Sequence, residues 1–596
     1  MTGDTDNLCR AILKDRRMPY LAALLAVVLA LPGVWTGWQL DDHLQRLVML
    51  GPPYSSYEPM DLFGIANGNP ELTREYKDQG IVPFWTSPGF RLSFFRPLTV
   101  LTVWLDYQLW PASPSLMHLH SILWFAALII ASGYLFRSLF GAGWIAGLAT
   151  LLNAADPTRA LPALWISSRH VLISTFFGVL FLLWHDRWRR GGWKLGSFLA
   201  PLALALALLA GEMGLAAVGY LVAHALFVDG AHRRSRATAM VPSLCVVFSW
   251  FLIYSIGGYG SAGSGTYHDP MTDFWIFLGS LVTHAPLLLA AEWSSLPADL
   301  ANVVPADQHA TVLLACLLVV VGVVLALLRT IRTSSLARFW SVGMLLSLAP
   351  IAATFPSGRL LSFVALGAAG LLAVYLGRLV ERFSSVKAGS FHCSLVHAAV
   401  VLVLALKLAI APLLIPVAAW LLDSIDDSMM EAISTVPDDD QISGQDLVIL
   451  NPPDQLYYGA YIPVVKRLQG KPAPGRIKVL AAGPTEMEVL RVDSSTIRVR
   501  ISAGLFSGPF GRSFRSTSTP MHRGEEIRIS GMSTVVQEVD SNGDPTEMLF
   551  RFSHSLGDGR LRLLRWENGA GYVTFVPPPI GETVALPPAR TQFNIF

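Results

Sequence analysis

Long apolar runs separated by short polar segments occupy the first two thirds of this chain. The first run, over residues 19–38, holds roughly 20 residues almost free of charge, which is enough to cross a bilayer. The same pattern predicts further crossings near residues 115–136, 141–154, 168–185, 195–227 (two crossings), 240–258, 311–328, 340–354, 360–378 and 395–421. We therefore predict an α-helical polytopic membrane protein with about eleven transmembrane helices.

Two apolar segments do not fit a simple crossing. The segment SFFRPLTVLTVWLDYQLW at 93–110 has helical periodicity, but a crossing there would place Arg96 and Asp106 in lipid. We interpret it as a helix lying along the membrane interface. A crossing at 273–293 would put the basic loop RTIRTSSLAR outside, so we interpret that segment as re-entrant or interfacial.

Basic residues predict the orientation of the chain. Arg10, Lys14, Arg16 and Arg17 precede the first crossing and should keep the N-terminus in the cytoplasm. The basic loops HDRWRRGGWK and AHRRSR should lie on the same side, where they most simply fix the topology. An odd number of crossings then places the C-terminus outside.

The composition changes after residue 423. An acidic amphipathic connector comes first, followed by short β-rich runs that Gly, Pro, Asn and Asp separate: DLVILN, AYIPVVKRL, IKVLAA, STIRVRIS, EEIRIS, TVVQEV, MLFRFS, LRLLRW and YVTFV. They predict a C-terminal all-β soluble domain, a sandwich or small barrel. We expect a transmembrane domain over 1–423, with a first outer loop at 39–114, and a β-rich domain over 424–596.

Composition agrees with this organisation and narrows the chemistry. The chain of 596 residues is 53% hydrophobic and 14% charged, as expected for several membrane spans with a water-facing region. Its net charge of +2 offers no electrostatic footprint for nucleic acid. The 4 cysteines have no metal-binding or redox spacing, and none lies in the polar C-terminal region.

With this topology, costly polar side chains gather at the outer ends of the spans. They are Asp41, Asp42, His43, Arg96, Asp106, His118, His120, Arg169, Glu212 and Arg359. Carboxylates can act as a general base, and arginines bind phosphate through two parallel hydrogen bonds. Together they suit a pocket in which an anionic lipid headgroup is split. For the Asp41–Asp42 pair, an interfacial stop to the first helix is an equally simple interpretation.

The order of these motifs resembles a known family. WQLDDH, FFRPLTVLTVWLDYQLW, MHLHSILW, ALWISSRHVLIS, LLAGEMG and FPSGRLLSFVALG look like the integral-membrane glycosyltransferases of the GT-C superfamily. The resemblance covers roughly residues 19–380 and is greatest to bacterial proteins similar to protein O-mannosyltransferases and TMTC-type transferases. It differs at Val171, where the family pattern has an acidic residue, at Gly211, where it has a lysine, and in lacking C-terminal TPR helices.

The resemblance implies a reaction and a location. Such proteins take a sugar from a polyprenyl phosphate or diphosphate carrier and pass it to an acceptor outside the cytoplasm. For this chain it implies a bacterial inner-membrane protein with a periplasmic β domain and a protein, lipid or glycan acceptor.

Carried over to this chain, the resemblance makes Asp41 or Asp42 the general base. Arg96 and Arg359 would hold the carrier phosphate, and Arg169 and Glu212 would line the pocket. We expect no cofactor. The alternative is a divalent metal held by Asp41 and Asp42 together, which we do not favour because two adjacent carboxylates alone make a poor metal site.

Other functions fit parts of the pattern. A polysaccharide or O-antigen polymerase or ligase also has many spans and uses lipid-linked sugars. A transporter or flippase would show inverted repeats and polar breaks near the bilayer midplane, but this sequence has no such repeat. If the spans only anchored the β domain, the outward polar residues would have no function.

Overall fold

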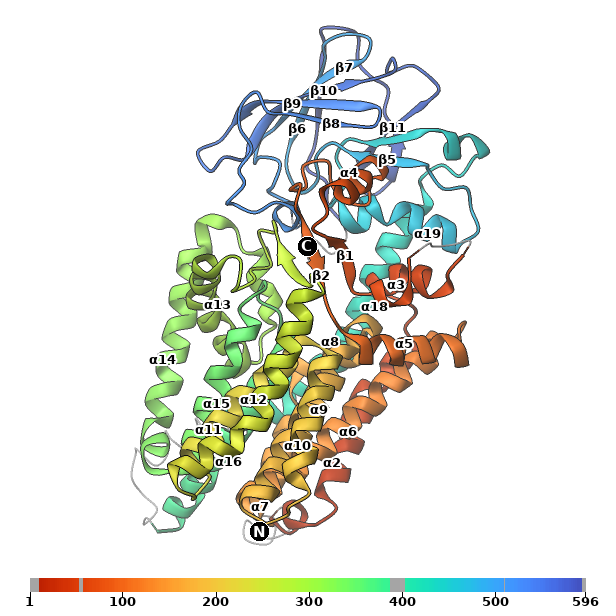
Figure 1. Cartoon of the computed structure of the whole chain (residues 1–596). Helices are drawn as coiled ribbons and strands as arrows, with labels where there is room; N and C mark the ends of the chain where they lie inside the picture. Colours follow the sequence, from red (N-terminus) through yellow and green to blue (C-terminus); the bar gives the residue numbers. More distant parts are fainter. Residues whose placement is uncertain (1–9, 53–56, 386–401, 509, 592–596) are drawn as a thin grey trace. The chain divides into compact units, whose positions relative to one another are not determined.

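The computed structural model describes residues 10–52, 57–385, 402–508 and 510–591 (Figure 1). Contacts within the chain divide it into two compact units. The helical unit comprises Met1–Trp38, Phe94–Gly257 and Trp275–Leu422, and the β unit comprises Gln39–Ser93, Gly258–Phe274 and Asp423–Phe596. The division places the outer segment 39–93 with the C-terminal residues, whereas sequence analysis assigned it to the transmembrane domain.

The helical unit is built almost entirely of apolar helices. They are α2 (Met18–Ala30), α5 (Pro97–Leu109), α6 (Pro114–Phe140), α7 (Trp144–Ala154), α8 (Ala160–Leu164), α9 (Arg169–Arg189), α10 (Gly196–Ala210), α11 (Ala216–Phe227), α12 (Arg233–Ile256), α13 (Phe274–Ser294), α14 (His309–Thr333), α15 (Ser335–Ile351), α16 (Ser362–Ser385) and α18 (Leu414–Ser434). The boundary between the units falls inside α18.

These helices confirm the predicted class of a multi-pass helical membrane protein. In the described part of the chain, 8 helical segments are long and apolar enough to cross a membrane, and four shorter apolar helices accompany them. Helix α13, where a re-entrant or interfacial segment was expected, is a continuous helix of 21 residues and is one of the eight. Its length and composition suit a span, with Pro286 inside it, and its placement as a re-entrant or interfacial segment stays a prediction.

Small residues let the helices of this unit approach closely. A Cβ atom at Gly343 of α15 would lie 2.2 Å from Cδ1 of Tyr220 on α11, and one at Gly367 of α16 would lie 2.3 Å from its hydroxyl. The Tyr220 hydroxyl donates to the Phe363 carbonyl at 2.6 Å. Three helices therefore meet around one buried tyrosine, as is typical of packing in membranes.

The β unit contains three sheets. The six-stranded sheet is antiparallel, in the order β13 (Thr583–Leu586), β6 (Met487–Arg491), β7 (Thr496–Ile501), β10 (Pro545–Phe552), β9 (Met532–Val539), β8 (Glu526–Ile529). The four-stranded sheet has the order β12 (Gly571–Thr574), β11 (Leu561–Glu567), β4 (Asp446–Ile449), β5 (Arg476–Val479). The smallest pairs β1 (Gly64–Asn67), β2 (Arg91–Ser93) and β3 (Gly260–Ala262).

The C-terminal domain is a β-sheet domain, as predicted, but it is not all-β. Strand β4 lies parallel to both β11 and β5, and helix α19 (Ile462–Leu468) connects β4 to β5. The prediction of a strand for AYIPVVKRL was therefore wrong. Pro463 explains the difference, because proline suits the first turn of a helix and cannot donate a hydrogen bond to a neighbouring strand.

Segment 39–93 contributes to the core of the β unit. Phe84 and Trp85 belong to the same buried apolar cluster as Val448, Val499 and Phe550 from strands of the two larger sheets. The Trp85 indole N–H donates to the Gly511 carbonyl at 3.3 Å. The segment therefore contributes to the folding of the C-terminal domain.

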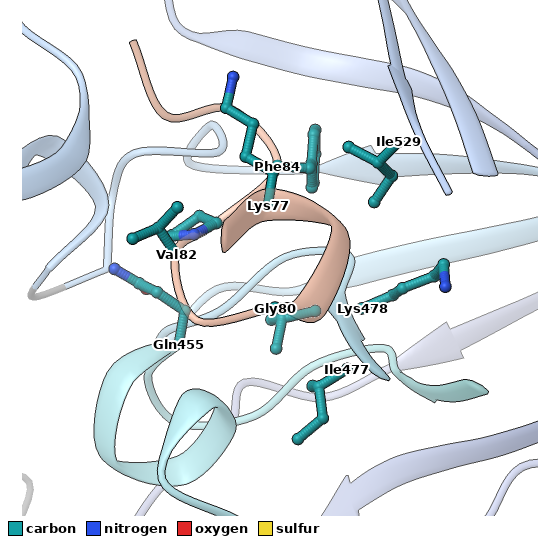
Figure 2. A pocket seen from close by; sticks show the side chains of 10 residues that line it. Lys77, Gly80, Val82, Phe84, Gln455, Ile477, Lys478 and Ile529 are labelled. Carbon is teal, nitrogen blue, oxygen red and sulfur yellow. The ribbon is translucent and has the colours of Figure 1, made fainter. Parts of the chain in front are cut away.

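Helix α4 (Pro70–Gln79) of this segment ends against strand β5. Gly80 follows it with a φ of +80°, and a Cβ atom there would lie 2.1 Å from the Ile477 carbonyl oxygen. Figure 2 shows the small pocket beside this contact, with Lys77, Phe84 and Gln455 around it. Burial lowers the pKa of Lys77 to about 8.

Candidate functional site

The two adjacent carboxylates lie at the start of a helix in the β unit. The first span ends at Trp35, and Asp41 and Asp42 begin α3 (Asp41–Leu50). They therefore do not end the first helix, as one interpretation of the sequence proposed. Their negative charge is favourable at a helix N-terminus, where backbone N–H groups carry a partial positive charge.

The residue before the pair has a strained backbone. Leu40 is buried and has φ 46° and ψ −113°. Its backbone N–H donates to Oδ1 of Asp426 at 2.8 Å, and the His43 imidazole lies 3.0 Å from the same oxygen. Strain of this kind persists only where surrounding contacts enforce it. His43 therefore helps to hold the turn that presents Asp41.

The two carboxylates have different surroundings. Asp42 is 2% exposed, and its Oδ2 accepts a hydrogen bond from the Gln39 backbone N–H at 3.2 Å. Asp41 is partly exposed, and its Oδ1 accepts from the hydroxyls of Tyr461 at 2.9 Å and Tyr457 at 3.2 Å. Burial, followed by the charge of Asp41, raises the pKa of Tyr461 well above its usual value, so its hydroxyl remains a neutral donor.

In the helical unit, Arg96 forms an ion pair with Glu212. Arg96 directly precedes α5, and its Nε lies 2.9 Å from Glu212 Oε2. The neighbouring Gly211 packs against His170 and Arg96, since a Cβ atom there would lie 3.4 Å from Cδ2 of His170 and 3.9 Å from Nε of Arg96. The GEM turn therefore brings an acid, an arginine and a histidine together.

Arg359 reaches the segment just before His170 from a distant part of the sequence. Its Nη1 donates to the Ser168 hydroxyl at 3.2 Å, and its guanidinium carbon lies 5.1 Å from the centre of the Trp165 ring. Ser168 lies two residues before His170, so Arg96 and Arg359 both lie close to the segment that carries this imidazole. We call Arg96, Arg359, His170 and Glu212 the arginine cluster.

Asp106, His120 and Arg169 form a buried network beside this cluster. Arg169 and Asp106 are fully buried and paired, and His120 Nδ1 lies 2.7 Å from Oδ1 of Asp106. Arg169 also donates to the Ser121 hydroxyl at 2.9 Å and to the Met117 carbonyl at 2.6 Å. These bonds connect α5, α6 and α9.

His118 is also bonded inside the helical unit. Its Nε2 lies 3.0 Å from the Gly37 carbonyl oxygen and 3.2 Å from the Thr36 hydroxyl. The side chain is fully buried, and its contacts join the start of α6 to the end of the first span.

The helical unit contains a second buried charge cluster. Nζ of Lys407 lies 3.1 Å from Oε1 of Glu292 and 3.4 Å from Oδ2 of Asp156. A cavity of about 210 Å³ is lined by these three side chains and by apolar residues. Pairing explains how a lysine in an apolar run is tolerated. Among the described residues, no group of three or more His, Cys, Asp or Glu side chains could hold a metal ion.

Comparisons with known proteins give similarity at the level of structure alone. No family model and no curated protein matches the chain. The oligosaccharyltransferase AglB from Archaeoglobus fulgidus, in complex with an inhibitory peptide and a dolichol-phosphate, has a TM-score of 0.39 and 14% identity, covering 77% of this chain and 64% of AglB. The chain thus spans less than two thirds of that protein's length.

ArnT from Cupriavidus metallidurans is similar to the same degree. Its apo structure has a TM-score of 0.39 and 14% identity over 75% of this chain and 84% of ArnT. The structure bound to undecaprenyl phosphate has a TM-score of 0.36 and 13% identity over 78% of this chain and 89% of ArnT.

Sequence reasoning did not find several of the residues described here. Tyr457, Tyr461 and Asp426 lie far along the chain from Asp41, in segments interpreted only as a connector and β-rich runs. His170 was part of a quoted motif, but nothing in the pattern distinguished it from a packed histidine. Glu292 had a usable signal, since it is an acid in an apolar run that must be paired.

Proposed function

We propose that this protein is a glycosyltransferase that moves a sugar from a polyprenyl phosphate or diphosphate carrier to an acceptor hydroxyl outside the cytoplasm. The main support is the arginine cluster of the helical unit, where Arg96 and Arg359 both lie close to segment 168–170 although they are far apart in sequence. Intramembrane or interfacial arginines are costly, and a phosphate headgroup is the substrate chemistry that they suit.

The arginines act on the leaving group. As the bond from the anomeric carbon to the carrier phosphate breaks, negative charge develops on the phosphate oxygens. Arg96 and Arg359 stabilise that charge because they are oriented before the reaction begins. The ion pair with Glu212 and the contact of Arg359 with the Trp165 ring provide this orientation.

Asp41 acts as the general base. It takes the proton of the acceptor hydroxyl while the oxygen attacks the anomeric carbon and the carrier phosphate departs with the bonding electrons. A single displacement of this kind inverts the anomeric carbon. We favour Asp41 over Asp42 because Asp41 is partly exposed, whereas Asp42 is 2% exposed and bonded to the Gln39 backbone.

The remaining predicted site residues have supporting roles in this proposal. Arg169, Asp106 and His120 hold the helices that carry the arginine cluster, and His118 joins α6 to the first span. This differs from the expectation that Arg169 lines the pocket, since Asp106, Ser121 and Met117 accept its hydrogen bonds.

A transfer assay tests the proposal. Purified protein is incubated with a panel of radiolabelled undecaprenyl- and dolichyl-phosphate sugars and with candidate acceptors, and the released carrier and the labelled product are both measured. We expect carrier release coupled to product formation for at least one donor. Products that grow by repeated units would instead indicate a polymerase, and movement of an intact lipid-linked sugar across vesicles a flippase.

A further inference from the structure

We propose that Tyr457 and Tyr461 of the C-terminal domain are positioning residues that orient the Asp41 carboxylate for proton transfer. This inference rests on the proposed function, because it gives the β domain a part in that reaction. It concerns only residues of the β unit. Helix α3, which begins with Asp41, lies beside α19 in this unit (Figure 1).

The geometry is a clamp with two donors. Both tyrosine hydroxyls donate to the same oxygen, Oδ1 of Asp41, at 2.9 Å from Tyr461 and 3.2 Å from Tyr457. Two bonds to one oxygen restrict rotation of the carboxylate about its Cβ–Cγ bond. The direction of the other oxygen, Oδ2, is thereby set before substrate binds, as efficient proton transfer requires.

The tyrosines are themselves held rigidly. They lie four residues apart, at a π-helical turn (Leu456–Ala460) followed by α19, and their ring centres are 5.1 Å apart. Oδ1 of Asp454 accepts hydrogen bonds from the backbone N–H groups of Leu456 at 2.8 Å and Tyr457 at 2.7 Å. Both rings are buried, with Tyr457 6% and Tyr461 3% exposed. π-Helical turns are costly and recur at functional sites.

A purely structural role is a weaker explanation of the same contacts. A buried tyrosine hydroxyl can bond with any acceptor, including a backbone carbonyl or a serine. The hydroxyl of the adjacent Tyr458, for example, lies 3.4 Å from the Ser428 hydroxyl. Here both hydroxyls meet the charged end of a partly exposed carboxylate, next to the strained Leu40. Bonds to an ionised carboxylate also make it a weaker base, which suits a group that must be deprotonated at neutral pH.

The charged and titratable groups around Asp41 come from three elements. They are Asp42 on α3, the His43–Asp426 pair between α3 and α18, and Tyr457 and Tyr461 in and directly after the π-helical turn. Replacing the tyrosines by phenylalanine removes only the two hydroxyl donors and leaves the other groups in place.

The test uses the full-length protein and the variants Tyr457→Phe, Tyr461→Phe and the double variant. We expect the double variant to lower kcat about 10–100-fold with little change in the KM for the donor. We also expect the acidic limb of the kcat–pH profile to move to higher pH, because the ionised carboxylate loses two donors. The matched control is Tyr458→Phe, whose hydroxyl faces Ser428 and which should change neither quantity.

A second measurement does not depend on turnover. Carbodiimide modifies protonated carboxyls, so the pH dependence of Asp41 labelling, followed by mass spectrometry, reports its protonation. The midpoint should move to higher pH in the double variant and stay unchanged in Tyr458→Phe. If the labelling midpoint, kcat and pH profile of the double variant all match the unsubstituted protein, the positioning role is wrong.

The variant Asp41→Asn, with both tyrosines intact, distinguishes failure of the proposed function from failure of the positioning role. If Asp41→Asn keeps full transfer, Asp41 is not the base, and the positioning role falls with it. If Asp41→Asn is inactive while the tyrosine variants are normal, only the positioning role is overturned.

Discussion

At the scale of single residues, neighbours that look identical in sequence have different surroundings. Asp41 and Asp42 are adjacent acids, yet one is partly exposed against two tyrosine hydroxyls and the other is buried against the backbone of its own turn. The difference follows from the geometry of a helix start, where successive side chains point about 100° apart.

This difference predicts separate effects for the two acids. Asp41→Asn should lower transfer about 10²–10⁴-fold because the proton acceptor is lost. Asp42→Asn should keep activity within about tenfold and reduce stability by roughly 0.3–1 kcal/mol, since it removes a charge at a helix N-terminus. Initial rates and thermal unfolding of the two purified variants check both statements. The opposite pattern of rates would make Asp42 the base.

The arginine cluster gives a prediction about geometry as well as charge. Arg359→Lys should already weaken carrier binding, because lysine keeps the charge but loses the two-pronged arrangement of donors. Arg359→Ala should weaken it further, and Arg96→Ala should act in the same direction. The measurement is the affinity for undecaprenyl phosphate. Arg338→Lys is the matched control, because Arg338 also lies over an aromatic ring, 5.4 Å from the centre of Phe227. Unchanged affinity in Arg359→Ala would contradict the role.

At the scale of elements, the junction between α4 and β5 depends on a glycine. Gly80 combines a φ of +80° with contact so close that a Cβ atom would lie 2.1 Å from a backbone carbonyl oxygen. Neither element can move away cheaply, because the carbonyl belongs to a strand paired in the four-stranded sheet. The outer segment 39–93 is thereby docked through backbone shape as well as apolar burial.

Gly80→Ala should therefore destabilise the protein by about 2–3 kcal/mol, from backbone strain plus overpacking. Gly470→Ala is the control: Gly470 has a φ of +67°, but a Cβ atom there would meet nothing within 4 Å. It should cost only about 1 kcal/mol, the backbone part alone. Thermal unfolding of both variants separates the two contributions, and equal losses would show that the close contact has no cost.

At the scale of the whole molecule, the alternation of basic loops predicts the orientation. The N-terminus should lie in the cytoplasm, and residues after 430 should lie outside. Alkaline phosphatase fused after residue 430 should be active, and a fluorescent reporter that folds only in the cytoplasm should be dark. An inactive phosphatase and a fluorescent reporter would mean that residues after 430 lie in the cytoplasm. The proposed reaction would then lie on the wrong side of the membrane for an acceptor outside the cytoplasm.

The sequence by itself determined the class of the protein. Apolar runs of membrane length identify spans such as α6 and α14 without any tertiary information, because burial of backbone groups in lipid requires long helices. Alternating patterns likewise located strands such as β7 and β10. The order of the polar motifs indicated Arg96 and Arg359 as candidate site residues, since a charge in an apolar run is costly wherever it lies.

Tertiary structure decided everything that depends on contacts between distant segments. In the run 460–468, Pro463 argues against a central strand, but the need for a connecting helix comes from the parallel pairing of β4 with β5. Phe84 and Trp85 share a core with strands of the C-terminal segment, which begins more than 300 residues later (423 minus 85 is 338). The tyrosines that bond to Asp41 lie further still along the chain, 416 and 420 residues away, and no local pattern reports such a partner. Hydrophobic periodicity shows which face of an element is buried, but the side chain that meets a carboxylate depends on how the chain folds back.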